Sequence, residues 1–404
     1  MDVSESSAGP GSPACPACAE PAAEPFVEVA SLPVHVGVLW HSAAAAAAAP
    51  RGPMRMVLCP RCGYVWNTAF DAGLLDYEQE YDNALHGSAL FRRFEAETVD
   101  HLVEHYGLRD RTVVEVGCGD GRFLGLLCAA GVAGAVGFEP GYRPERRSPE
   151  ASDRVEVLAE PDAADHPRRS ADLVAVRQVL EHMADPVGFL RMLRAGIGDR
   201  DTALYVDVPN GARLTDDLAF WDLMYEHCGS YVAPALRQVA RAAGFAVTAV
   251  RPAHAGQFLV LEARPAAVDT RPPPASGAVA DEVAAHVERA ERFGAAFERR
   301  VAEWRAQLAG HARRGDTVVA WGAGGRAVNF FNTVGIGAEV AAVVDLNPAK
   351  QHTYLAGTGH EIVPPDRLTG DLAPDVVIVV NGVYADEVRA DLGARGLVPK
   401  VEVA

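Results

Sequence analysis

The side chains with the greatest chemical capacity lie together at residues 225–231, which read Tyr-Glu-His-Cys-Gly-Ser-Tyr. Imidazole and phenol groups can remove or relay a proton, and an adjacent carboxylate can raise the basicity of an imidazole. The cluster therefore predicts a proton-transfer site that includes Tyr225, Glu226 and His227. The alternative is an aromatic loop that covers a pocket, in which His227 only makes a hydrogen bond.

Other polar residues are candidates for the same site. His182 follows an apolar run at 171–176 that we expect to be a buried strand. It is a candidate acid, base or binding residue, and the alternative is a histidine that merely starts a helix. Tyr81 and Asn83 lie in a polar segment between two expected domains. We assign Tyr81 to the catalytic group, and Asn83 and Tyr231 to substrate binding.

Within the stretch Val113–Leu124, an apolar run is followed by a glycine-rich turn. Three glycines alternate in it: Gly117, Gly119 and Gly121. The next apolar run, Ala135–Phe138, ends at Glu139. Glycines let the backbone approach a ligand closely, and an acid at the end of the second strand can accept hydrogen bonds from a ribose diol. The alternatives are a turn that binds nothing and a turn that binds another nucleotide.

The spacing Glu-x-Gly-x-Gly-x-Gly at residues 115–121 resembles the first motif of class I S-adenosylmethionine (SAM) methyltransferases. The dinucleotide fingerprint differs, because two residues precede its last glycine. The resemblance implies that Glu115 and the glycines lie along the methionine half of SAM and that Glu139 holds the ribose. We add Gln178 to the cofactor-binding group, because residues 177–182 should overhang the same crevice.

Four of the seven cysteines form two Cys-x-x-Cys pairs, namely Cys15 with Cys18 and Cys59 with Cys62. Four thiolates close a tetrahedral structural zinc site, and a redox pair would not explain two copies. The sequence therefore predicts a zinc ion that does no chemistry. His35 and His41 lie between the pairs and are rival ligands.

A second glycine loop begins at Gly322, after an apolar run at 317–321, and includes Gly324, Gly325 and Arg326. It predicts a strand, a turn and a helix of a second Rossmann-like fold. A glycine loop at a helix N-terminus favours an anion such as a diphosphate. We assign Gly324 and Arg326 to a substrate phosphate, and the alternatives are an empty structural fold and an NAD site.

Apolar runs alternate with helical patterns around both glycine loops, which predicts the α/β class. The first set should form a central class I methyltransferase sheet, with residues 257–263 pairing antiparallel to the preceding strand. A small zinc-binding domain should precede this sheet, and a C-terminal Rossmann-like domain should follow it. The predicted boundaries are a disordered tail at 1–13, a zinc-binding domain at 14–75, a SAM-binding domain at 76–265, a linker at 266–279, and a helix with the C-terminal domain at 280–404.

Composition narrows the partners. The chain has 404 residues, 49% of them hydrophobic, and a net charge of −17. This charge, without a basic cluster, argues against a nucleic-acid substrate. The sequence has no signal peptide and no apolar stretch of about 18 residues, which predicts a cytoplasmic protein that acts on a small molecule and has no membrane partner.

The order of paired knuckles, SAM motif and second glycine loop resembles the sugar C-methyltransferases of natural-product pathways, over about residues 15–400. Those enzymes methylate nucleotide-linked 4-keto-sugars, typically at C3. Family members commonly carry a Tyr-x-Glu-His cluster, whereas Tyr225, Glu226 and His227 are contiguous here. The segment that begins at Tyr81 also matches the family's tyrosine-bearing loop only loosely.

This resemblance implies methyl transfer to carbon, which requires a proton to be removed next to a carbonyl group. We predict His227 as the base, aided by Glu226, with Tyr225 or Tyr81 stabilising the enolate oxygen and His182 in reserve. One rival function is an O- or N-methyltransferase of another natural-product intermediate. The other is a non-catalytic zinc protein that binds a nucleotide-sugar.

Overall fold

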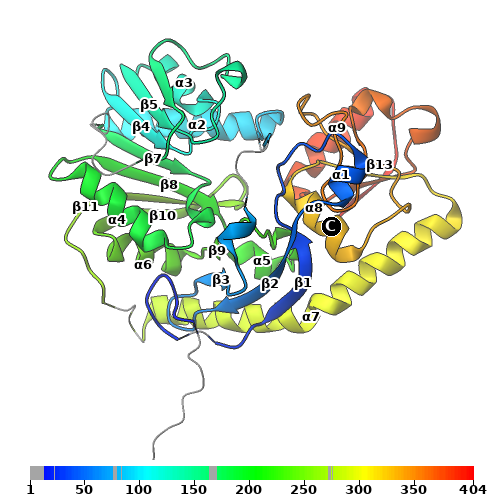
Figure 1. Ribbon diagram of the computed structural model, residues 1–404, viewed down its shortest axis with the longest axis horizontal. Helices are drawn as coiled ribbons and strands as arrows, with labels where there is room; N and C mark the ends of the chain where they lie inside the picture. The colour runs from blue at the N-terminus through cyan, green and yellow to red at the C-terminus, as the bar shows by residue number, and fades with distance from the viewer. Residues whose placement is uncertain are drawn as a thin grey trace, which may run out of the picture.

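The computed structural model describes residues 13–21, 23–75, 80–82, 84–162, 171–271, 274 and 276–404. Asn83, residues 1–12 of the expected tail and part of the expected linker lie outside the described residues. The described residues form β-sheets of seven, five and four strands. The two larger sheets occupy opposite sides of the view in Figure 1, and the long helix α7 (Ala278–Arg314) runs below the N-terminal strands toward the C-terminal half.

The apolar runs around the first glycine loop form the seven-stranded sheet, in the order β10-β11-β8-β7-β4-β5-β6. Its strands are β4 (Thr112–Val116), β5 (Gly134–Phe138), β6 (Val155–Leu158), β7 (Leu173–Arg177), β8 (Ala203–Pro209), β10 (Phe245–Ala253) and β11 (Phe258–Pro265). Neighbours from β6 to β8 pair in parallel, whereas β11 pairs antiparallel with β8 and β10. The antiparallel pairing predicted for residues 257–263 is therefore confirmed.

Helices cover both faces of this sheet, because successive strand residues point to opposite sides. On one face, Val113 and Ala175 belong to the same apolar core as residues of α2 (Ala89–Tyr106) and α3 (Arg122–Ala129). On the other face, Val114 and Val174 share a core with α4 (Pro186–Ile197) and α6 (Ala233–Ala242). The buried strands hold the loops at their carboxyl ends in place.

The second glycine loop belongs to a fully parallel five-stranded sheet, in the order β14-β13-β12-β15-β16. Its strands are β12 (Val318–Trp321), β13 (Ala342–Val344), β14 (Ile362–Val363), β15 (Val376–Val379) and β16 (Lys400–Val403). Helix α8 (Gly325–Val334) follows β12, and α9 (Ala385–Ala394) follows β15. The predicted α/β class is confirmed, with parallel strands in both larger sheets.

The four-stranded sheet is antiparallel and was not predicted. It contains β1 (Val27–Pro33), β2 (Arg51–Leu58), β3 (Val65–Asn67) and β9 (Gly229–Ser230). The short helix α1 (Ala43–Ala47) lies between β1 and β2. Strand β9 comes from the 225–231 cluster, so residues distant in sequence complete the N-terminal sheet.

The apolar core of the N-terminal sheet continues into α7 and the C-terminal half. Val65 of β3, Phe293 of α7 and Phe330 of α8 all belong to it. The short helix α5 (Ala212–Asp216) packs against α7. Among the described residues, no helix combines the length and the apolar character needed to cross a membrane.

Candidate active site

The glycine loop after β4 forms one wall of the crevice predicted for SAM. Its φ angles are 73°, 55° and 81° at Gly117, Gly119 and Gly121. A Cβ atom on Gly117 would lie 2.2 Å from Val179 Cγ2, whereas one on Gly119 would meet nothing within 4 Å. The turn therefore needs glycine, and its outer side is open to a ligand at Gly119.

Glu139 follows β5 on the same rim. Its carboxylate accepts hydrogen bonds from the backbone N–H groups of Gly119 at 3.2 Å and Gly141 at 3.1 Å. The carboxylate thus stands beside the open part of the glycine loop. A ribose diol placed there would lie within reach of it, so the geometry fits the role predicted for Glu139.

Glu115 belongs to a buried ion cluster beneath the glycine loop. Arg177 lies 3.8 Å from Glu115 Oε1 and 3.2 Å from Asp207 Oδ2, and its guanidinium stands 3.9 Å from the centre of the Phe123 ring. Burial raises the pKa of Glu115 to about 8, although the charge of Arg177 lowers it. Glu115 Oε2 is buried without a hydrogen-bond partner among the described residues. It therefore retains the capacity to bind a ligand cation.

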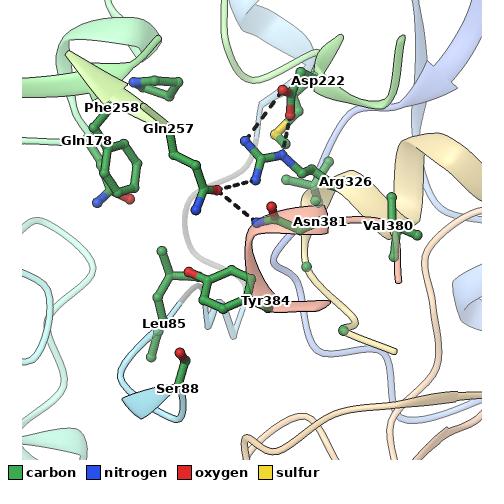
Figure 2. A pocket seen from close by; sticks show the side chains of 18 of the residues that line it. Leu85, Ser88, Gln178, Asp222, Gln257, Phe258, Arg326, Val380, Asn381 and Tyr384 are labelled. Carbon is green, nitrogen blue, oxygen red and sulfur yellow. Dashed lines mark hydrogen bonds and ion pairs between the residues drawn. The ribbon is translucent and has the colours of Figure 1, made fainter. Parts of the chain in front are cut away.

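Gln178 connects this crevice with a neighbouring pocket. It directly follows β7 and has a φ of 54°, a conformation that costs energy for a residue other than glycine. Such strain is found at functional sites, where the surrounding structure enforces it. The backbone N–H of Gln178 is held by Asp207 O at 2.9 Å, and its side chain lines the pocket (Figure 2).

The pocket lies between the carboxyl ends of the parallel strands of the two larger sheets. In open α/β sheets, ligands bind outside these ends, where neighbouring strands lead in opposite directions along the sheet. Such points lie between β4 and β7 and between β12 and β15. Both halves contribute lining residues, which include Gln178, His182, His227, Arg326, Lys350 and Tyr384.

Two imidazoles and a carboxyl group meet in this pocket. The ring centroids of His182 and His227 lie 5.0 Å apart, with the rings nearly perpendicular. The carboxyl group belongs to Glu181, and one potential ligand atom from each of the three residues lies within 4.8 Å of the others. The sequence analysis missed Glu181, although its position beside His182 was a signal.

Burial disfavours the charged form of each of these three groups. It lowers the pKa of His227 well below its usual range, and a positive charge on His182 or Arg326 lowers it further. Burial also lowers the pKa of His182, and it raises that of Glu181 well above its usual range. An uncharged imidazole can accept a proton, so the arrangement suits a general base.

Neither Glu226 nor Tyr81 lines the pocket. The Glu226 carboxylate accepts a hydrogen bond from His35 Nδ1 and another from the Val36 N–H group, each at 3.1 Å. The Tyr81 O–H group donates to the same carboxylate, also at 3.1 Å. Tyr225 and Glu226 form a turn, and His227 lines the pocket whereas Glu226 does not.

The phenols of the 225–231 cluster also lie outside the pocket. Tyr225 is fully buried, and its oxygen accepts a hydrogen bond from the Asp71 N–H group at 2.9 Å. Tyr231 is equally buried and donates its O–H to Leu180 O at 3.0 Å. Of the titratable groups in this cluster, the imidazole of His227 is the one that lines the pocket.

Arg326, predicted to bind substrate, reaches the pocket but already has partners. It forms an ion pair with Asp222 and donates a hydrogen bond to Gln257 Oε1 at 2.5 Å. Asn381 donates to the same oxygen at 2.8 Å. Figure 2 shows this chain of contacts along one wall of the pocket. The carboxylate of Asp222 offsets the charge of Arg326, so Arg326 attracts an anion less strongly than an unpaired arginine would.

Lys350 is a better anion-binding candidate, and the sequence analysis missed it. It is one of only two lysines in the chain, the other being Lys400. Lys350 is 5% exposed and lines the pocket, and its ammonium group has no ion-pair partner among the described residues. Its rarity in this sequence was a usable signal.

The N-terminus of α8 lies in the same part of the pocket. Gly322 and Gly324 are open, since a Cβ on either would meet nothing within 4 Å. A helix N-terminus presents free N–H groups and a partial positive charge to a ligand. Together with Lys350, it fits an anion.

The four paired cysteines come together as predicted. Their sulfur atoms all lie within 4.8 Å of one another, with Cys15 and Cys62 at 3.7 Å and Cys18 and Cys59 at 3.5 Å. Four sulfurs around one Zn²⁺ stand roughly 3.8 Å apart, so the cluster fits a tetrahedral zinc site. The rival ligands lie elsewhere: His35 contacts Glu226, and His41 contacts Glu80 at 3.1 Å.

Two family models match consecutive parts of the chain. One, described as a methyltransferase domain, matches residues 90–250, and the other, described as a C-methyltransferase C-terminal domain, matches residues 252–395. The first contains the SAM crevice and the imidazole pair, and the second contains Arg326 and Lys350. The chain is a SAM-dependent methyltransferase, and the two matches together support a C-methyltransferase.

Solved structures resemble part of the chain. One is a Burkholderia thailandensis 1,6-didemethyltoxoflavin-N1-methyltransferase with bound 1,6-didemethyltoxoflavin and S-adenosylhomocysteine; it is 20% identical over 44% of this chain and 79% of its own, with a TM-score of 0.34. Another is the magnesium protoporphyrin IX methyltransferase of Synechocystis PCC 6803 with bound S-adenosylhomocysteine; it is 18% identical over 47% of this chain and 91% of its own, with a TM-score of 0.35. None of the curated proteins matches the chain.

Proposed function

We propose that this enzyme methylates a carbon atom next to the carbonyl group of a nucleotide-linked keto-sugar. The observation that carries the proposal is the close pair of His227 and His182 beside Glu181, whose burial disfavours the charged imidazoles. This group lies in a pocket that is also lined by Gln178, which directly follows β7, and by the open end of α8. Methyl transfer to oxygen or nitrogen needs little help from a base, whereas a carbon acid needs one held against it.

The residues of the crevice would hold SAM at one end of the pocket. The open glycine loop would receive the methionine half, Glu139 the ribose, and Glu115 the α-ammonium group. SAM supplies an electrophilic methyl group when bound. The chain's own task is to align the acceptor carbon with that group, and alignment alone can supply several kcal/mol of the barrier.

His227 would remove the proton from the acceptor carbon. The proton moves to a ring nitrogen of His227, and the electron pair stays on the substrate as an enolate. Glu181 and His182 lie close enough to share the new positive charge. Tyr225 does not reach the pocket, so we assign it to packing, and we assign Tyr81 to holding Glu226.

The C-terminal half would hold the nucleotide end of the substrate. Lys350 and the N-terminus of α8 line the pocket and supply positive charge there. A diphosphate fits such a site because its negative charge is matched by an ammonium group and by helix N–H groups. An NAD molecule would add a second cofactor for which the chemistry has no use.

Solvent exchange tests this proposal. A nucleoside-diphosphate 4-keto-6-deoxy sugar is incubated in D₂O with the enzyme and S-adenosylhomocysteine, and deuterium next to the carbonyl group is measured by mass spectrometry. We expect exchange with the natural enzyme and a reduction of roughly 10²–10⁴-fold in His227→Ala, because a positioned base contributes that much. The affinity for S-adenosylhomocysteine should be unchanged.

His41→Ala is the matched control, since His41 is a solvent-exposed histidine far from the pocket lining. It should exchange deuterium at the natural rate. If the natural enzyme binds the sugar nucleotide but catalyses no exchange, carbon deprotonation is excluded. That result would favour O- or N-methyl transfer instead.

A further inference from the structure

The carboxylate of Glu226 is fastened to the N-terminal part of the chain. Its three donors, His35 Nδ1, the Val36 N–H group and the Tyr81 O–H group, each stand at 3.1 Å. His35 and Glu226 are each 1% exposed. A buried carboxylate with three donors is a strong attachment point, because hydrogen bonds to charged groups are stronger than neutral ones and water does not compete.

The residues on either side of Glu226 are attached to the same part of the chain. The Tyr225 oxygen accepts a hydrogen bond from the Asp71 N–H group at 2.9 Å, and Cys228 O accepts one from the Asn67 N–H group at 3.2 Å. Strand β9 then pairs with β3. Hydrogen bonds therefore hold the chain to the N-terminal part on both sides of His227.

The Tyr225 side chain also packs tightly against strand β2. A Cβ atom on Gly52 of β2 would lie 2.3 Å from the Tyr225 ring, so only glycine permits this packing. The Cys59–Cys62 turn joins β2 to β3, and a zinc ion on the four cysteines would cross-link that turn to residues 15–18. Strand β3, which pairs with β9, thus begins shortly after the metal-binding turn.

We propose that the N-terminal sheet positions the imidazole of His227, with His35 as the positioning residue that holds Glu226. The inference rests on the proposed role of His227, which is fixed between residues held at 226 and 228. A base must be held in a defined geometry to act, and a displacement of an ångström is costly. The cysteine cluster would then support the geometry of the base as well as the fold.

Amide hydrogen exchange of residues 223–231 tests this inference without the sugar substrate. In His35→Leu, we expect exchange in this segment to be at least about tenfold faster, because a hydrogen bond to a buried charge is lost. The carbethoxylation rate of His227 with diethylpyrocarbonate should rise in parallel. Zinc content should stay the same because all four thiolates are retained, and affinity for S-adenosylhomocysteine should stay within about twofold.

Two variants separate positioning from general damage. His35→Asn places a donor near the Nδ1 position and should restore protection of the segment. His41→Leu removes the exposed His41–Glu80 pair, which has the same 3.1 Å distance, and should change nothing. If His35→Leu fails to fold, Tyr81→Phe removes one hydroxyl donor to Glu226 and should loosen the segment less but measurably.

Unchanged exchange of residues 223–231 in folded His35→Leu and Tyr81→Phe would overturn the inference. Removal of zinc with a chelator should loosen the same segment, and equal protection with and without the metal would refute the role of the cysteine cluster. These outcomes are separate from the proposed function. A protein that binds no S-adenosylhomocysteine would contradict that function while leaving the attachment measurable.

Discussion

At the scale of single residues, the main electrostatic feature of the SAM crevice is a cluster of buried charged side chains. Glu115 and Asp207 are almost fully buried and share the guanidinium of Arg177. Glu115 keeps an unpartnered oxygen, and its pKa is raised to about 8 by burial. A ligand cation next to this oxygen favours the charged carboxylate, so ligand binding and ionisation are linked.

This linkage predicts a pH dependence of S-adenosylhomocysteine binding. Free Glu115 is mostly protonated at pH 6.5 and half ionised at pH 8, while the ligand's ammonium group prefers the ionised form. The association constant should therefore rise about tenfold from pH 6.5 to pH 8. Calorimetric titration measures it. Glu115→Gln should bind with a flat pH profile, and an equally flat profile in the natural enzyme would exclude contact between Glu115 and the ammonium group.

The residue types in the sequence predicted which side chains could take part in the chemistry better than they predicted which side chains contact each other. His182 and His227 were both named as candidates, and they share one pocket. Glu226 was chosen as the partner of His227 because it is adjacent in sequence, yet the nearby carboxyl group is that of Glu181. Glu226 lies in a turn and bonds to His35 and Val36 instead of lining the pocket, so its aid to His227 stays a prediction.

The long helix α7 is the element that joins the N-terminal sheet to the C-terminal half. Its buried residues recur every three or four positions, as in Ala290, Phe293, Phe297 and Val301. His286 occupies a place in this apolar stripe and is 1% exposed. Its Nδ1 atom stands 3.5 Å from Thr215 Oγ1 of α5, and its Nε2 atom has no partner among the described residues.

Burial of His286 predicts that acid destabilises this packing. Burial and the charge of Arg289 lower the pKa of His286 to about 4. Below pH 6.5, His286 becomes protonated in the unfolded chain but stays neutral in the folded chain. The free energy of unfolding therefore falls as the pH falls from 6.5 toward 4. From pH 6.5 to pH 5 this one group should cost about 2 kcal/mol of unfolding free energy.

Urea unfolding at pH 7.5 and pH 5.0 measures that loss. His286→Leu keeps an apolar side chain in the stripe and should lose less stability on acidification than the natural protein, by about that amount. The exposed histidine variant His41→Leu should behave as the natural protein does. Parallel losses in His286→Leu and the natural protein would show that His286 titrates normally in the folded state.

Element prediction succeeded where the local pattern is strong. A helix was expected to begin at residue 280, and α7 spans Ala278–Arg314, because its apolar period is sustained. The apolar strands on both sides of the glycine loops were expected for the same reason. Strand β9 has two residues and exists only because β3 lies beside it, so no local pattern encodes it.

At the scale of the whole molecule, the two larger sheets lie on opposite sides of Figure 1, and the carboxyl ends of parallel strands from both contribute residues to one pocket. Contacts between residues distant in sequence set this arrangement. Tyr384 bonds to His254 at 3.0 Å, and Ser88 donates to Glu387 at 2.6 Å. The sequence predicted each glycine loop separately. It could not predict a shared pocket, because these contacts follow no periodic pattern.

A pocket lined by both halves of the chain predicts that nucleotide binding and S-adenosylhomocysteine binding can be weakened separately. Lys350→Met should weaken binding of thymidine diphosphate or uridine diphosphate by about tenfold, because one charge-assisted contact to phosphate is lost. The effect should shrink at high salt. Affinity for S-adenosylhomocysteine should not change. The control is Lys400→Met, which removes the other lysine, exposed and paired with Glu402. Equal nucleotide affinity in both variants, measured by calorimetry, would exclude Lys350 from the phosphate site.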